Sequence, residues 1–213
     1  MIIKKIKGVA EPQMVAEAFE KAGIEYQTLE NVNWAAEYPY HPMVKVAMAH
    51  DGDNIYIHYC VEEQSVRAVA EADQGRVWED SCVEFFVQPN SEDGIYYNIE
   101  CNCATKLLLC AGADRHDRER APKEVTDAIR RWSSLGREPF AERRGNTAWN
   151  MALIVPKSSF FKHEIDCLDG LEVRGNVYKC GDLQMETHFV SLFPITTEKP
   201  DYHRPEFFEV IRF

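Results

Sequence analysis

The stretch Val77–Val87, VWEDSCVEFFV, is the part of the chain from which the rest is best interpreted. From Cys82 the residues alternate around Glu84 and then end in the apolar run FFV, a pattern typical of a strand buried on one face. Glu84 therefore occupies a position where a core residue is not normally acidic. Trp78 lies at the margin of this strand.

A second stretch, Tyr96–Asn102 (YYNIECN), alternates in the same way. A strand has a side-chain period of two, so the polar residues of this stretch share one face: Asn98, Glu100 and Asn102. If the two strands are neighbours, these side chains and Glu84 form a polar patch with Trp78 beside it. Such an arrangement suits a sugar, because the C–H face of the sugar ring packs on an aromatic ring and its hydroxyls take hydrogen bonds.

Length and charge restrict the class of protein. The 213 residues predict a single domain, residues 1–213, long enough to bury a core without metal or disulfides. A net charge of −11 argues against nonspecific binding to nucleic acid or to an anionic membrane. Neither a membrane-spanning segment nor a signal-peptide pattern is found. The seven cysteines favour free thiols in a reducing compartment, so we expect a cytoplasmic protein.

Short strand-like runs separated by turn signals predict an all-β fold, an antiparallel β-sandwich (jelly-roll-like) with one or two short helices. The pattern predicts helices over 11–23 and 156–167, and a long exposed loop over 112–124. Two hairpins are expected, one pairing 44–50 with 54–61 across DGD, the other pairing 140–144 with 148–155 across Gly145-Asn146.

Motifs of common enzymes and of metal sites are absent. The chain has no glycine-rich phosphate loop, no G-x-S-x-G and no H-E-x-x-H, and its cysteines lack the paired spacing of a zinc site. Glu84 and Glu100 remain a candidate acid–base pair of a glycoside hydrolase, since two strand-borne acids can lie at the required separation. The alternatives for the same residues are structural: Trp78 in the core, and Glu84 on a solvated outer face.

Five segments resemble the family-9 carbohydrate-binding modules, in particular the free-standing family-9-like proteins of about this length. They are WEDSCVEFFV (78–87), YYNIECN (96–102), RGNVYKCGD (174–182), HFVSLFPI (188–195) and KPDYHRPEFFEVIRF (199–213). The resemblance implies a β-sandwich that binds sugar without cleaving it, classically at the reducing end of a glycan. It also implies a pair of clamping tryptophans and bound calcium that supports the structure.

Carried over by motif, Trp78 matches a clamp residue and Glu84 a hydroxyl-binding acid. The remaining polar contacts implied by the resemblance are Asn98, Glu100, Asn102, Arg174 and Asn176. The chain departs from the family at the second clamp position, where Leu192 replaces tryptophan. Two outcomes are expected from this loss: either sugar affinity is weak, or Phe193 or Trp34 replaces the missing ring. The charged residues before the last strand are interpreted as a structural ion-pair and turn network: Asp201, His203, Arg204 and Glu206.

Three hypotheses follow, in order of preference. The first is non-catalytic binding of a mono- or oligosaccharide in polysaccharide catabolism, with a glycoside hydrolase as candidate partner, no required cofactor and calcium as an optional structural ion. The second is a glycoside hydrolase that uses Glu84 and Glu100. The third is a protein-interaction β-sandwich whose sugar site has decayed. Neither a nucleic acid nor a membrane is expected as a partner.

Overall fold

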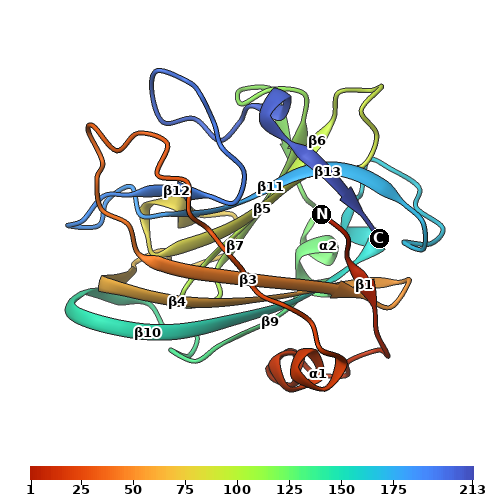
Figure 1. The fold of residues 1–213 in the computed structure, drawn as a ribbon, viewed down its shortest axis with the longest axis horizontal. Coiled ribbons are helices and arrows are strands. Elements are labelled where there is room, and N and C mark those ends of the chain that lie inside the picture. The colour runs from red at the N-terminus through yellow and green to blue at the C-terminus, as the bar shows by residue number, and fades with distance from the viewer.

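The computed structural model describes all 213 residues, and its main feature is a pair of β-sheets packed face to face (Figure 1). The first sheet has six strands in the order β1-β3-β4-β10-β9, with β2 beside β3. Their bounds are β1 Lys4–Lys5, β2 Gln27–Thr28, β3 Met43–His50, β4 Asn54–Ala68, β9 Arg130–Ser133 and β10 Phe140–Pro156. The short β1–β3 contact is parallel, whereas the other pairs are antiparallel.

The second sheet has seven strands in the order β12-β11-β5-β6-β7-β8, and β13 pairs with the other end of β11. Their bounds are β5 Cys82–Gln88, β6 Tyr96–Asn102, β7 Leu107–Gly112, β8 Arg118–Arg120, β11 Glu172–Cys180, β12 Phe189–Ser191 and β13 Glu209–Arg212. All of these pairs are antiparallel. The all-β sandwich predicted from the sequence is confirmed.

The main core fills the space between the sheets and contains 33 buried residues. Alternation decides which side chains enter it: Val83, Phe85 and Val87 of β5 point into the core, as do Tyr97 and Ile99 of β6. The intervening residues of β5 and β6 therefore point away from the core, as the period of two predicts. They are nonetheless buried, because further segments of the chain cover the outer face of this sheet.

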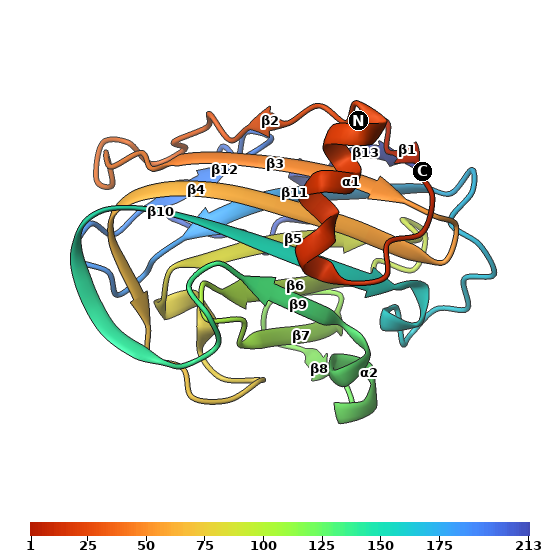
Figure 2. The same ribbon diagram turned by 90° about the horizontal axis from the view of Figure 1, so that it is seen from below.

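Helices cover only small parts of the sandwich. Helix α1 (Val15–Ala22) follows the 3-10 turn Pro12–Met14 and packs Val15 and Phe19 on the outer face of the six-stranded sheet (Figure 2). It ends at Gly23, whose φ of 60° is left-handed, so the predicted helix over 11–23 is confirmed. Helix α2 is Lys123–Ala128, and the other 3-10 turns are Val77–Glu79, Lys157–Ser159 and Pro205–Phe207. None of the helices has the length and hydrophobicity needed to cross a membrane.

Three local predictions are wrong. Residues 140–155 form one 17-residue strand, β10, rather than a hairpin. Gly145, with a φ of 114°, lies where the register against β4 shifts, so it serves a bulge instead of a turn. The helix expected over 156–167 is a single 3-10 turn, after which Phe160 is buried in the core. The loop expected over 112–124 contains β8 and the start of α2.

Candidate functional site

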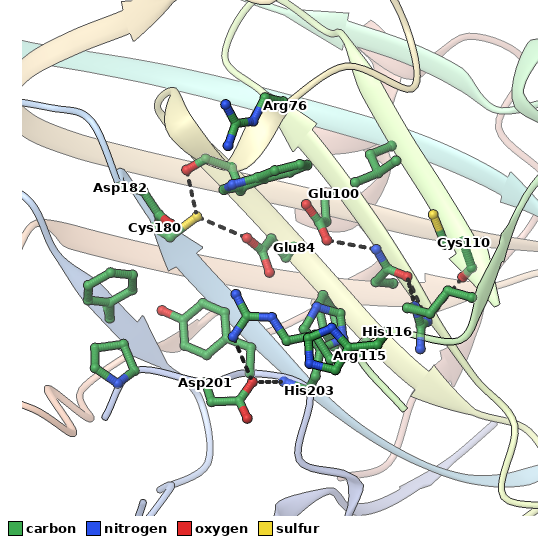
Figure 3. Close-up of a pocket in the computed structure, with 18 of the residues that line it drawn as sticks. Arg76, Glu84, Glu100, Cys110, Arg115, His116, Cys180, Asp182, Asp201 and His203 are labelled. Atoms are coloured by element: carbon green, nitrogen blue, oxygen red, sulfur yellow. Dashed lines mark hydrogen bonds and ion pairs between the residues drawn. The ribbon is translucent and has the colours of Figure 1, made fainter. Parts of the chain in front are cut away.

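A cavity of about 460 Å³ lies on the outer face of the seven-stranded sheet, the face opposite the main core (Figure 3). Strands β5, β6, β7, β8 and β11 supply its floor, and the turn at Val77–Glu79, the β7–β8 loop and residues 200–203 supply its walls. The residues that line it are Arg76, Trp78, Glu84, Phe86, Asn98, Glu100, Leu108, Cys110, Arg115, His116, Arg118, Arg120, Cys180, Asp182, Phe189, Pro200, Asp201, Tyr202 and His203.

Strand register brings the floor residues together. Glu84 of β5 lies directly opposite Glu100 of β6, and Phe86 lies opposite Asn98. Asn98 in turn lies opposite Cys110 of β7. Residues directly opposite in an antiparallel pair point to the same face, so the outward positions of one strand continue across its neighbours. The polar patch expected from the alternation of β5 and β6 is therefore formed.

One arginine fixes the polar side of the floor. Arg118 donates from Nε and Nη2 to Asn98 Oδ1, at 3.0 and 2.7 Å, and its guanidinium lies 4.1 Å from the Tyr96 ring centre. With its oxygen held in this way, Asn98 presents its Nδ2, which donates to Glu100 Oε1 at 2.7 Å. The other oxygen of that carboxyl, Oε2, is buried and has no hydrogen-bond partner in the protein. It is thus a polar atom available to a ligand.

Glu84 and Glu100 are buried and Asp182 is half-buried, and removal of a carboxyl from water favours its protonated form. Burial, followed by the charge of Glu100, raises the pKa of Glu84 well above its usual range. Burial raises the pKa of Glu100 to about 7 and that of Asp182 to about 6. Near neutral pH the two glutamates can therefore donate as well as accept hydrogen bonds, which suits hydroxyl groups of either orientation.

The opposite wall carries a histidine and an ion pair. Burial lowers the pKa of His203 to about 3, so the ring is neutral, and its Nδ1 lies 2.9 Å from the Tyr96 hydroxyl. Asp201 Oδ1 accepts the His203 backbone N–H at 3.1 Å and lies 3.5 Å from Arg115 Nη1. These groups place hydrogen-bonding atoms across the cavity from the two glutamates (Figure 3).

Two half-buried aromatic residues line the cavity. Trp78 is carried by the turn Val77–Glu79, with the Arg76 guanidinium 5.7 Å from its ring centre. Phe189 lies opposite Cys180 across β12 and β11 and so shares the cavity face with it. Its ring is held edge-on by Tyr38, with ring centres 4.9 Å apart. An aromatic surface and buried polar groups are thus available to the same ligand.

Comparison with known families agrees with this geometry. Residues 13–213 match the family described as carbohydrate-binding family 9. The chain belongs to carbohydrate-binding family 9. Members of this family are binding modules and are generally not catalytic.

Solved structures resemble the chain to different degrees. A candidate carbohydrate-binding protein from Bacteroides uniformis is 47% identical and superposes with a TM-score of 0.96, covering 99% of this chain and 97% of that one. A family-9 module from Caldicellulosiruptor kristjanssonii was solved with glucose (TM-score 0.61, 100% and 94% covered) and with cellotriose (0.60, 100% and 92%). At 11% identity it supports the fold alone. No curated protein sequence matches significantly.

Four of the eight binding residues predicted from the sequence line the cavity: Trp78, Glu84, Asn98 and Glu100. The structure places the other four outside it: Asn102, Arg174, Asn176 and Phe193. Their side-chain polar groups are used within the fold. Asn102 donates to Asp80 Oδ2 at 2.9 Å and accepts the backbone N–H of Lys106 at 2.8 Å.

Asn176 Nδ2 donates to the Phe193 carbonyl at 3.0 Å, and Asn176 Oδ1 accepts the Phe193 N–H at 3.0 Å. Arg174 donates to the Phe208 carbonyl. Of the two rings expected to replace the missing clamp, Phe193 does not line the cavity, and Trp34 is buried and donates to the Thr197 carbonyl at 2.9 Å. Phe189 is the additional ring that does line it.

Most of the residues that form the cavity walls were not predicted from the sequence. Arg115, His116 and Arg118 come from the segment expected to be a solvated loop, and Asp201 and His203 come from the segment interpreted as structural. The structural interpretation still fits in part, since Asp201 accepts the His203 backbone N–H and pairs with Arg115, and Arg204 pairs with Glu206. Two cavity residues did carry a usable signal: Cys180 and Phe189 alternate with core residues Val177 and Val190 in strand-like runs.

Proposed function

We propose that the cavity binds a mono- or short oligosaccharide at its reducing end without cleaving it. The observation that carries this proposal is the presence of Trp78 and Phe189 in the same 460 Å³ cavity as the Glu84, Glu100 and Asn98 network. Sugars require this combination of aromatic surface and fixed polar groups. The glucose and cellotriose held by the C. kristjanssonii module support the same ligand class.

The geometry favours a chain end over the middle of a chain. The floor is a continuous sheet, and walls rise from three separate segments: residues 76–78, the β7–β8 loop and residues 200–203. A terminal ring enters such a cavity more readily than an internal residue of a long glycan. Family membership supports a role in polysaccharide catabolism with a glycoside hydrolase as partner. The seven free cysteines, five of them buried, support a reducing compartment, and we propose the cytoplasm.

The hydrolase hypothesis is less well supported by the carboxyl environment. A retaining glycosidase needs one ionised carboxylate as nucleophile and one protonated acid. Burial raises the pKa of both Glu84 and Glu100, which disfavours the ionised nucleophile near neutral pH. A protein-docking role is likewise less well supported, because the polar groups lie at the bottom of a cavity rather than on an exposed face.

The decisive experiment is isothermal titration of the purified protein with mono- and disaccharides, each paired with its borohydride-reduced alditol. Binding of a sugar but not of its alditol is expected, because reduction opens the terminal ring. Equal binding of both would refute reducing-end recognition while leaving sugar binding intact. If no sugar of the panel binds to the folded protein with calcium supplied, the proposal itself is refuted. Hydrolysis of any disaccharide by the protein in the calorimeter cell would restore the enzyme hypothesis.

A matched pair of variants locates the site. Trp78→Ala is expected to abolish binding while the far-UV circular dichroism stays unchanged, because Trp78 supplies aromatic surface to the cavity. Trp132→Ala is the control, since Trp132 is also half-buried but lies on the opposite side of the sandwich, beside α1. Unchanged affinity in the Trp78 variant would remove this residue from the site.

A further inference from the structure

The floor of the cavity borders a cluster of two thiols and a carboxyl. The sugar-binding proposal uses the carboxyl, Glu84, but neither thiol. Cys82 of β5 lies directly opposite Cys180 of β11, and Glu84 follows two residues later on the same face of β5. The two sulfurs and a Glu84 oxygen all lie within 4.8 Å of one another. Cys180 Sγ is 2.9 Å from Glu84 Oε1. The two cysteines are far apart in sequence, so only the sheet register brings them together.

This cluster has the composition of a metal site. A tetrahedral zinc ion with Zn–S bonds of about 2.3 Å holds neighbouring ligand atoms about 3.8 Å apart, which lies within the observed limit. Thiolate and carboxylate ligands suit zinc and similar divalent ions, whereas calcium and magnesium prefer oxygen ligands alone. We propose that Cys82, Glu84 and Cys180 bind a thiophilic divalent cation of the zinc class. This cluster is distinct from a calcium site in its ligand chemistry.

An independent observation at the same place supports a ligand. Glu100 is only 4% exposed and faces Glu84 across the β5–β6 pair, yet its Oε2 has no partner. No lysine or arginine forms an ion pair with either glutamate. Buried carboxyls are ordinarily paired with a cation or fully hydrogen-bonded. A divalent cation bound at the cluster would lie beside this unsatisfied carboxyl, although Glu100 is not one of the three residues whose ligand atoms come within 4.8 Å of one another.

The cluster borders the cavity. Glu84 and Cys180 line the cavity, whereas Cys82 lies beneath them. A cation therefore enters through the cavity mouth and binds at its floor. Each thiol releases its proton to solvent as it becomes a ligand, so binding is accompanied by the release of protons and strengthens as the pH rises.

The test uses the full chain, stripped of metal and kept reduced, with all seven thiols verified by titration in denaturant. Zinc is titrated against a chromophoric chelator, and cobalt is added separately as a spectroscopic probe. We expect one ion per chain and a thiolate-to-cobalt charge-transfer band. Proton release is measured by calorimetry in buffers of different ionisation enthalpy. Absence of stoichiometric binding would overturn the proposal.

Variants assign the ligands. Cys82→Ser, Cys180→Ser and Glu84→Gln are each expected to weaken zinc binding by more than about 100-fold. Loss of a group that only hydrogen-bonds to a metal ligand weakens binding by up to about 100-fold, and loss of a ligand itself is expected to cost more. Cys101→Ser is the matched control, because Cys101 is a buried thiol on the core face of β6. Equal loss in the control, or a cobalt band that survives when both Cys82 and Cys180 are replaced, would refute the assignment.

Folding is checked by circular dichroism, and Glu84→Gln tests the site if a cysteine variant does not fold. The sugar-binding proposal is separate, since none of these measurements involves a sugar. Repeating the sugar titration with and without zinc then shows whether the two ligands interact.

Discussion

Glu84 and Glu100 lie directly opposite each other on β5 and β6, and both side chains are buried in the cavity floor. Their two partners differ: Glu84 Oε1 is near the Cys180 thiol at 2.9 Å, whereas Glu100 Oε1 accepts from Asn98 Nδ2 at 2.7 Å. Glu100, which lines the cavity, therefore keeps one oxygen without a hydrogen-bond partner. Two acids in such a position are expensive for folding, which indicates that they serve a ligand.

The first prediction concerns that unused oxygen. Glu100→Gln is expected to weaken sugar binding about tenfold. A hydrogen bond to a carboxylate contributes on the order of 1.5 kcal/mol to binding, and about 1.4 kcal/mol corresponds to tenfold in affinity. The measurement is isothermal titration with the best sugar of the panel. Glu119→Gln serves as control, since Glu119 lies on nearby β8 but outside the cavity and pairs with Lys162. Similar losses in both variants would show a general charge effect.

The second prediction compares two phenylalanines of one segment. Phe189 lines the cavity and Phe193 does not, although both are half-buried. Phe189→Ala is expected to lower sugar affinity about tenfold, because an aromatic contact contributes about 1 kcal/mol beyond its buried area. Phe193→Ala is expected to leave affinity unchanged. The opposite order of effects would favour Phe193, the ring expected from sequence, over the ring that the structure indicates.

The third prediction concerns a buried ion pair that joins the two sheets. Lys179 Nζ of β11 lies 2.9 Å from Glu63 Oε2 of β4, and the side chains are 0% and 1% exposed. The same Nζ lies 2.6 Å from His188 Nε2, and Trp149 Nε1 donates to Glu63 Oε1 at 2.7 Å. Lys179→Met leaves the Glu63 carboxylate buried without its cation, so we expect a loss of about 3–5 kcal/mol in the free energy of unfolding.

Urea denaturation measures this loss. Arg212→Met is the control, because the Arg212–Glu172 pair has side chains that are 60% and 56% exposed. Removing such a surface pair is expected to change stability by less than about 1 kcal/mol. A comparable small change in Lys179→Met would mean that Glu63 is protonated or solvated in the variant. In that case the pair would not account for the docking of the sheets.

The fourth prediction concerns acid sensitivity. His58 is 4% exposed, and burial lowers its pKa to about 4. In the unfolded chain the His58 imidazole is protonated near pH 6.5, whereas in the folded chain it is not protonated until about pH 4. Stability from this residue is therefore complete above pH 6.5 and is lost as the pH falls toward 4. When the pH falls from 7 to 5, the free energy of unfolding is expected to decrease by about 2 kcal/mol less in His58→Gln than in the unaltered protein.

Urea unfolding at a series of pH values tests this difference. His116→Gln is the control, because His116 is exposed in the β7–β8 loop. Its stability profile is expected to follow that of the unaltered protein. Parallel profiles for His58→Gln as well would show that His58 does not contribute to acid sensitivity.

Strand identity and the polar face of the site could be predicted from local patterns. The period of two in 82–88 and 96–102 places Glu84, Asn98 and Glu100 on one face whatever their neighbours are, because successive side chains of a strand point to opposite sides. The longer elements were less predictable. A glycine such as Gly145 favours a turn and a bulge equally, and only the long partner strand β4 decided between them.

The cavity walls depended on contacts that no local pattern encodes. Asn102 follows the same alternation as Glu100, but the Asp80 carboxylate and the backbone at Lys106 take its hydrogen bonds. Arg118 belongs to a charged segment typical of solvent, yet it folds back onto Tyr96 and Asn98.

By itself the sequence determined the sandwich, the outward acids of β5 and β6 and the aromatic Trp78, since these follow from alternation and composition. Only the tertiary structure decided which side chains share the cavity. It paired Cys82 with Cys180 and placed Phe189 beside them, because strand register and loop crossings join residues distant in the chain.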